Sequence, residues 1–275
     1  MMYLLQKISF FYSFYRRAHT IYDVHSPLLS DILLPLFYGK KPKTGDIEQR
    51  RKCLSKDKRQ INKTEYGAGS TLLKGKKLFV NKMATSSPVS SKEGFWLALL
   101  ADKQNIKTVL ELGTHFGLSG AYLISLNKNA RLFTIEGCPE TAAIAAETFA
   151  QLNLQNRIHQ QIGPFDEILP SFLPQFPPID LLFIDGNHRG QPLLYYLHIC
   201  SPFLSANGMI ILSDIYWSED MKKTWNLISQ KYTHFHVIDL FHFGILIPRN
   251  NEKGERHTLS VIDLKWKPWR IGLFQ

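Results

Sequence analysis

Cysteine is scarce in this chain, and its three cysteines are far apart. Cys53, Cys138 and Cys200 form no CxxC pair. Zinc knuckles and disulfide-stapled secreted domains need closely spaced or numerous cysteines, so the pattern argues against both classes. It fits a reducing compartment, and we expect a cytoplasmic protein.

Long apolar runs are also missing. The most apolar stretch, residues 1–14, is interrupted by Lys7 and followed by Arg16 and Arg17. It is shorter than the about 20 residues that a spanning helix needs, and no signal-peptide cleavage site is evident. We therefore expect no membrane span, with peripheral membrane contact of this aromatic segment as the alternative.

The positive charge is concentrated in one segment. The chain has a net charge of +10, and residues 40–82 hold fourteen Lys or Arg against four Asp or Glu, an excess equal to that net charge. Such a segment is typical either of a solvated, mobile face or of a surface that binds a polyanion. Composition leaves both interpretations open.

Strands and helices alternate from about residue 107. Strands are expected over residues 108–112, 131–136, 157–162, 179–185 and 209–214. Helices are expected between them, over residues 118–126, 140–152, 165–172 and 192–204. This alternation predicts a parallel sheet with helices on both faces.

The pattern changes after residue 214. A helix is expected over residues 218–230, followed by strands over 233–240 and 243–247 whose short connection forces antiparallel pairing, and an added strand over 259–264 is an option. The prediction is an α/β, Rossmann-like, doubly wound sheet of seven strands, five parallel and two in a C-terminal antiparallel hairpin.

Residues 1–90 lack this regularity. Residues 7–38 look helical, with breaks expected at Pro27 and Pro35, and the basic segment with Gly67-Ala68-Gly69-Ser70 follows. We predict an N-terminal helical and basic appendage over residues 1–90, which would cap the mouth of the sheet, and a second domain over residues 91–275.

Two acids end neighbouring predicted strands. Glu111 precedes a turn with Gly113 and Gly117, and a charge at a buried strand end needs a partner. The glycines would let the backbone approach a nucleotide-like ligand closely. Glu136 lies 23 residues after Gly113, near the about 20 residues at which dinucleotide folds place an acid on a ribose diol. Alternatively, Glu111 is a helix-capping or salt-bridged acid at a strand end, and Glu136 is an exposed acid at a strand end.

These motifs, in this order, resemble the class I S-adenosylmethionine-dependent methyltransferases, in the O-methyltransferase branch with catechol-type and sugar-type enzymes. The resemblance covers roughly residues 90–248 and includes the terminal hairpin. The matching motifs are Leu110-Glu111-Leu112-Gly113-Thr114 with Gly117, Thr134-Ile135-Glu136, Asp180-Leu181-Leu182-Phe183-Ile184-Asp185-Gly186-Asn187-His188, and Gly208-Met209-Ile210-Ile211-Leu212-Ser213-Asp214.

The resemblance implies S-adenosylmethionine as the cofactor of residues 91–275. Glu111 would organise the ammonium group of the methionine moiety, and Glu136 would accept the ribose hydroxyls. Phe165 would stack on the adenine, with a core position as the alternative. The other residues implied to bind the cofactor are Gly113, Thr114, Gly117, Ser119, Gly163, Pro164 and Asp185.

The resemblance also implies O-methylation of a small-molecule or sugar hydroxyl. His188 is the expected general base, because a neutral imidazole is available near neutral pH, and a loop histidine without a catalytic task is the alternative. Asp185 and Asp214 are the other candidate catalytic residues and would hold a divalent cation such as Mg²⁺. The neighbours Ser213 and Ile215 supply no third carboxylate or amide, so metal dependence is in doubt.

Other functions stay open at this point. A nicotinamide-dependent oxidoreductase would also use a glycine turn, but normally as GxGxxG. A polyanion-binding protein or an RNA methyltransferase would use the basic segment 40–82, although no Asn-Pro-Pro-Tyr-like motif follows the fourth strand. The expected partner is a small-molecule acceptor rather than nucleic acid, and a dimer is an option.

Overall fold

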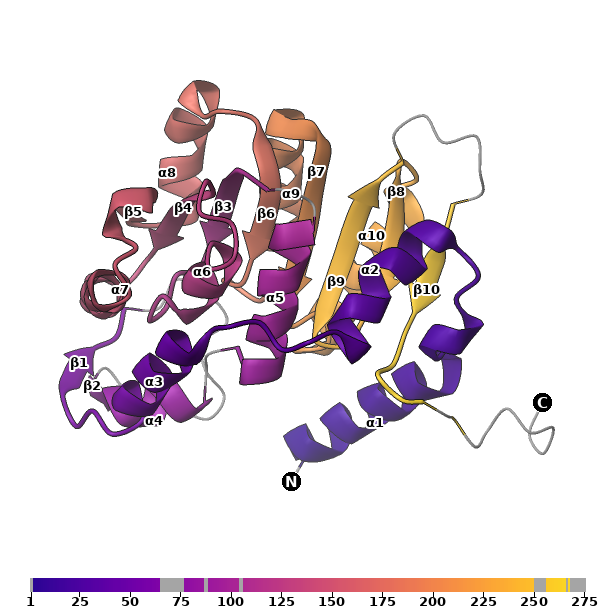
Figure 1. The fold of residues 1–275 in the computed structure, drawn as a ribbon, viewed down its shortest axis with the longest axis horizontal. Coiled ribbons are helices and arrows are strands. Elements are labelled where there is room, and N and C mark those ends of the chain that lie inside the picture. Colours follow the sequence, from indigo (N-terminus) through magenta and orange to yellow (C-terminus); the bar gives the residue numbers. More distant parts are fainter. Residues whose placement is uncertain are drawn as a thin grey trace. The chain divides into compact units, whose positions relative to one another are not determined.

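The structure is a computed structural model that describes residues 2–64, 77–86, 89–103, 106–249, 256–265 and 267. Its residues group into two units, drawn in Figure 1. One unit is Lys41–Gly208, and the other combines Met1–Lys40 with Met209–Gln275. This grouping differs from the predicted division at residue 90. That division concerns separately folding domains and stays a prediction.

Four parallel strands form the centre of the Lys41–Gly208 unit, in the order β6-β3-β4-β5. They are β3 (Thr108–Leu112), β4 (Arg131–Glu136), β5 (Ile158–Ile162) and β6 (Ile179–Ile184). The register pairs Leu112 of β3 with Ile135 of β4 and with Ile184 of β6, so the carboxyl ends of these strands share one edge. Ligands of open α/β sheets bind at that edge.

Helices pack on this sheet, as the alternation predicts. Their bounds are α5 (Ser91–Lys103), α6 (Leu118–Leu123), α7 (Pro139–Gln151), α8 (Phe165–Phe172) and α9 (Gly190–Cys200). The contacts place α6 on β4, and α7 on both β4 and β5. Pro139 begins α7, where its missing N–H would have no intrahelical partner in any case.

The expected alternation is confirmed, with differences at the ends of elements. β3, β4 and α8 have the predicted bounds. β7 (Leu204–Ser213) begins five residues earlier than expected, because α9 ends at Cys200 and a short turn of 3-10 helix follows it. Pro202 lies in that turn and has no N–H with which to bond the carbonyl of His198, as a longer α9 would require.

Much of the described part of the basic segment lies in helices and strands. It contains α3 (Gly45–Leu54), the antiparallel pair β1 (Gln60–Asn62) and β2 (Lys77–Phe79), and α4 (Val80–Ser86). Most described lysines and arginines of this segment are exposed, as a solvated face requires, whereas Arg50 on α3 is only 7% exposed. The mobility of the segment stays a prediction. The Gly67-Ala68-Gly69-Ser70 element lies outside the described residues.

The second unit combines the two ends of the chain. Its elements are α1 (Met2–Arg17), α2 (Pro27–Tyr38), α10 (Glu219–Lys231), β8 (Phe235–Asp239), β9 (Phe243–Pro248) and β10 (Thr258–Ser260). β9 pairs antiparallel with β8 and with the end of β7, which confirms the predicted hairpin. β10 pairs in parallel with β8, so the described residues hold eight strands from β3 to β10 and not seven.

The two prolines of the first helical stretch act differently from each other. Pro27 begins α2, and Ser26 caps this helix by accepting a hydrogen bond from Leu29 N–H. Pro35 lies inside α2, so the break predicted there is wrong. The helix continues because one side of it is buried in the unit, through Leu29, Ile32, Leu33 and Leu36.

No helix of the described residues meets the length and apolarity needed to cross a bilayer.

A buried carboxylate connects four segments of the second unit. Asp239, at the end of β8, is 4% exposed. Its Oδ2 accepts hydrogen bonds from the Tyr216 hydroxyl (2.6 Å), the Trp225 indole (3.3 Å) and the Arg17 guanidinium (3.2 Å). Its Oδ1 accepts the N–H of Phe241 at 2.9 Å. The N-terminal helix is thus bound to the C-terminal strands through one side chain.

Replacing Asp239 by Ala is expected to destabilise the protein by about 3 kcal/mol, because buried donors lose their acceptor and Arg17 loses its counter-charge. The measurement is the free energy of unfolding in urea. Ser260→Ala is the control: it removes the 3.4 Å bond to Asp239 and an exposed 3.2 Å bond from Arg17 Nε, and should cost about 1 kcal/mol or less. Equal, small losses in the two variants would contradict this account.

Candidate functional site

The predicted site residues of the Lys41–Gly208 unit lie on β3 and β4 and in the segments that follow β3, β5 and β6. Those after β3 are Gly113, Thr114, Gly117 and Ser119; those after β5 are Gly163, Pro164 and Phe165, and those after β6 are Asp185 and His188. Glu111 lies on β3 opposite Thr134, and Glu136 ends β4 opposite Ile162. Asp214 follows β7 in the other unit. A common site of Asp214 with Asp185 and His188 stays a prediction.

Glu111 is fully buried and is held by hydroxyl groups. Ser119 donates to its Oε1 at 2.6 Å, and Thr134 donates to its Oε2 at 2.7 Å. The Thr114 hydroxyl lies 2.5 Å from that of Thr134 and donates to it, because the hydrogen of Thr134 is already used. Burial raises the pKa of Glu111 to about 7, although both hydroxyls favour the anion.

A carboxyl group poised near neutrality is a suitable partner for a cation, because a nearby positive charge favours its ionised form. Helix α6 approaches this group closely: a Cβ on Gly120 would lie 2.8 Å from Oε2 of Glu111. The predicted role of Glu111 at the ammonium group stays a prediction. Ser119, predicted to bind the cofactor, bonds Glu111 here.

At two positions of the glycine turn, the backbone conformation and the close packing both require glycine. Gly113 has φ +107°, and a Cβ on it would lie 2.4 Å from the carbonyl oxygen of Asp185. Gly117 has φ +78°, and a Cβ on it would lie 2.7 Å from the ring of Phe149. Side chains are strained in these conformations and would overlap their neighbours. The turn therefore packs directly on the segment after β6.

Glu136 is half-buried and is bound by backbone N–H groups. His115 N–H donates to Oε2 at 2.8 Å, and Cys138 N–H donates to Oε1 at 3.0 Å. Burial raises the pKa of Glu136, while the bonds from Cys138 and His115 and the charge of Lys63 act in the opposite direction. The turn after β3 thus orients the acid at the end of β4.

His115 lies in the turn among the candidate site residues, and it was not one of the residues predicted from the sequence. It lies in the glycine turn with φ +47°, and neither buried ring nitrogen has a hydrogen-bond partner among the described residues. Burial lowers the pKa of His115 to about 3, and the charge of Lys63 acts in the same direction, so the imidazole is neutral. The signal available in the sequence was a polar ring inside the turn that contains Gly113 and Gly117.

The loop after β6 is held by an asparagine. Asn187 has φ +51°, and its Nδ2 donates to the Tyr196 hydroxyl at 2.9 Å. Its Oδ1 accepts a hydrogen bond from Arg189 Nε at 2.9 Å. His188 follows Asn187 in this loop and is half-buried, as is Asp185. Asn187 was not among the predicted site residues, although it lies within the motif that ends at His188.

Phe165, the predicted neighbour of the adenine, packs on the same loop. A Cβ on Gly186 would lie 2.8 Å from its ring, and the ring meets that of Tyr196 edge-on at 5.5 Å. The ring is half-buried, so one part of it contacts the protein and another part does not. Stacking on adenine stays a prediction.

A family model described as a methyltransferase domain (Methyltransf_24) matches residues 110–215. A catechol O-methyltransferase of Niastella koreensis is 36% identical over 128 residues, which cover 46% of this chain and 57% of that protein. A catechol O-methyltransferase of Sus scrofa is 30% identical over 130 residues, which cover 46% of this chain and 69% of that protein. The chain thus spans little more than half the length of the first of these curated relatives.

Solved structures share the fold. An O-methyltransferase from Bacillus cereus in complex with SAH superposes with a TM-score of 0.55 at 20% identity, covering 81% of this chain and 96% of that chain. An SAH-bound methyltransferase from Podospora anserina superposes with a TM-score of 0.57 at 16% identity, covering 82% and 97%. The predicted Rossmann-like α/β class is confirmed.

The raised pKa of Glu111 predicts a pH dependence of stability. Its folded value of about 7 lies above the ordinary value of 4.5, so its contribution is fully present below pH 4.5 and is lost as the pH rises through 7. In urea unfolding without cofactor, wild type should lose about 3 kcal/mol relative to Glu111→Gln between pH 4.5 and pH 8. Glu167→Gln, at an exposed acid, is the control. A difference between wild type and Glu111→Gln that does not change with pH would contradict the prediction.

Proposed function

Because this chain belongs to the O-methyltransferase branch of the class I S-adenosylmethionine-dependent methyltransferases, we propose that it methylates a hydroxyl group of a small molecule or a sugar. The observation that carries the proposal is the pair of acids Glu111 and Glu136 on either side of one glycine turn. They lie at the sheet edge where open α/β folds bind ligands.

The residues at this edge fit S-adenosylmethionine, which supplies the sulfonium methyl group that is transferred. Glu111 has a pKa near 7, and an ammonium group nearby would favour its anion. Glu136 receives two N–H groups at its two oxygens and keeps lone pairs for the ribose hydroxyls. The remaining cofactor contacts of the proposal are Gly113, Thr114, Gly117, Ser119, Gly163, Pro164, Phe165 and Asp185.

His188 is the proposed general base, which removes the proton of the acceptor hydroxyl. Its loop is held by the bonds of Asn187 to Tyr196 and Arg189. One feature counts against a divalent cation: neither Ser213 nor the buried Ile215 supplies a carboxylate or an amide beside Asp214. Asp185 and Asp214 orient the acceptor or His188 in this mechanism. A divalent cation such as Mg²⁺ held by the two carboxylates is the alternative.

The nucleic-acid alternatives lack support. The relatives reported above are O-methyltransferases, and two arginines of the basic segment are already paired. Arg50 and Arg59 both bond the carboxylate of Glu147. A small-molecule acceptor therefore remains the proposed partner.

Cofactor binding is the direct test of the proposed function. Wild type should bind S-adenosylhomocysteine saturably in isothermal titration and should not bind NAD. Glu136→Ala should weaken this binding at least about tenfold, because the ribose hydroxyls lose a charged acceptor. Glu167→Ala, at an exposed acid of α8, is the matched control. Saturable binding of NAD alone would refute the proposal.

His188→Ala should lower methyl transfer by about a hundredfold or more and leave the affinity for S-adenosylhomocysteine within about twofold. Turnover is measured with labelled cofactor and a panel of phenols and sugars. His198→Ala is the control, because His198 is exposed on the neighbouring α9. Unchanged turnover in His188→Ala would remove His188 from the mechanism.

A further inference from the structure

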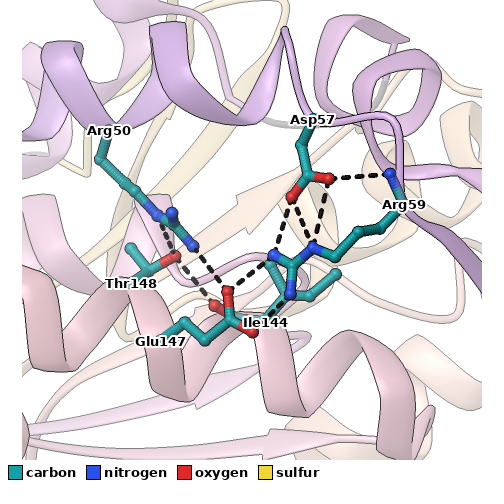
Figure 2. A network of polar contacts seen from close by, with 6 residues as sticks. All are labelled: Arg50, Asp57, Arg59, Ile144, Glu147 and Thr148. Carbon is teal, nitrogen blue, oxygen red and sulfur yellow. Dashed lines mark hydrogen bonds and ion pairs between the residues drawn. The ribbon is translucent and has the colours of Figure 1, made fainter.

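Residues 57–64 of the basic segment, called the arm below, are anchored on helix α7 at two places. The first anchor, shown in Figure 2, lies at the start of the arm. The Arg59 guanidinium bonds Asp57 at 2.7 Å and bonds both carboxylate oxygens of Glu147 at 2.7 Å. Two bonds from one planar guanidinium to one carboxylate fix the direction as well as the distance of this contact.

The second anchor is built by Asn62, near the end of the arm. Its backbone N–H and its side-chain amide donate to the two oxygens of Glu140, at 2.7 and 2.6 Å. Its carbonyl accepts a hydrogen bond from the Cys138 thiol at 3.4 Å, and the same sulfur accepts the N–H of Thr64 at 3.5 Å. Asn62 thus bonds the beginning of α7 through three of its groups.

Cys138 joins this anchor to the cofactor site. It lies at the N-cap position of α7, and its side chain makes no capping bond to the helix but binds the arm. Its backbone N–H donates to Oε1 of Glu136 at 3.0 Å, while Oε2 receives the N–H of His115 at 2.8 Å. One of the two N–H groups that orient Glu136 therefore belongs to the residue that the arm holds.

We propose that Asn62 is a positioning residue of the cofactor site: by holding Cys138 and the first turn of α7, it fixes the orientation of the Glu136 carboxylate toward the ribose hydroxyls. This inference rests on the proposed function. A carboxylate that accepts two hydroxyls at once needs one orientation, because hydrogen bonds weaken steeply away from their preferred angles. When the anchor is released, Glu136 samples other orientations and the affinity for the cofactor falls.

Thermodynamic linkage requires the reverse effect as well. If the bound arm raises the affinity for the cofactor, a bound cofactor favours the bound arm by the same factor. The Cys138 thiol reports on the arm, because it is 2% exposed and is bonded to Asn62 and Thr64. A thiol reagent reaches it when the arm is released or when the chain unfolds.

The first experiment is isothermal titration of the full chain with S-adenosylhomocysteine. Asn62→Asp keeps the shape of the side chain but places a carboxylate against that of Glu140, so it should release the anchor and lower the affinity about tenfold. Gln60→Glu is the matched control. It makes the same change of charge on the same face of β1, where the Gln60 amide makes no hydrogen bond to the described residues, and should stay within about twofold of wild type.

Two combined variants test whether the effect passes through these contacts. Adding Glu140→Gln to Asn62→Asp exchanges the amide and the carboxylate of the anchor, so the affinity should return to within about threefold of wild type. In a Glu136→Ala background, Asn62→Asp should cause less than about a twofold further loss, because the carboxylate that Asn62 orients is gone. A purely structural role of Asn62 would give the same loss in both backgrounds.

Thiol labelling tests the reverse direction. Cys53→Ser removes the exposed cysteine, and modification by iodoacetamide is then followed by mass spectrometry at Cys138 and at the fully buried Cys200 of α9. S-adenosylhomocysteine should slow the modification of Cys138 by a factor that levels off at about tenfold, the factor by which Asn62→Asp weakens binding. Cys200 is the internal control, since a reagent reaches it when the chain unfolds.

The inference and the proposed function fail in different ways. If wild type binds S-adenosylhomocysteine but Asn62→Asp binds equally well, or loses as much in the Glu136→Ala background, the inference is overturned and the proposed function stands. Modification of Cys138 that ignores the cofactor, or that slows in parallel with Cys200, also overturns it. If wild type does not bind, the proposed function fails and the inference fails with it. Should Asn62→Asp not fold, Asn62→Ala takes its place in the same measurements.

Discussion

The buried carboxyl group of Glu111 is the constraint on which the arrangement of the site depends. Taking this group out of water is costly, and the hydroxyls of Ser119 and Thr134 offset only part of that cost. The need to satisfy it brings the start of α6 and the strand β4 against the end of β3. A local requirement for hydrogen bonds thereby sets the distances between three elements.

The glycine turn that follows β3 contacts two further parts of the site. Gly113 lets the turn lie against the backbone of Asp185, and His115 N–H binds Glu136. The acids of β3 and β4 and the loop that carries His188 are consequently connected through one turn. Gly113 and Gly117 permit this close packing, because both have a positive φ and leave no room for a Cβ.

The basic segment adds a part that lies outside the matched methyltransferase domain. The family model covers residues 110–215, whereas the arm is residues 57–64 and its partners Cys138, Glu140 and Glu147 fall inside the match. The positive charge of this segment is used in part for internal ion pairs, since Arg59 pairs with both Asp57 and Glu147. An excess of charge in a sequence therefore does not by itself indicate a polyanion partner.

Local patterns in the sequence were sufficient for the parallel strands, the hairpin, the glycine turn and the acids at strand ends, because strand burial and turn geometry depend on neighbouring residues. Tertiary packing decided the rest. The continuation of α2 through Pro35 depends on the burial of one side of that helix. That the ring nitrogens of His115 meet no hydrogen-bond partner in the described part of the chain depends on which segments surround the ring. The connection from Thr64 through Cys138 to Glu136 joins residues 72 positions apart, and no local pattern contains it. Contacts between residues so far apart in the sequence form only when the whole chain packs, because they depend on which elements become neighbours in space.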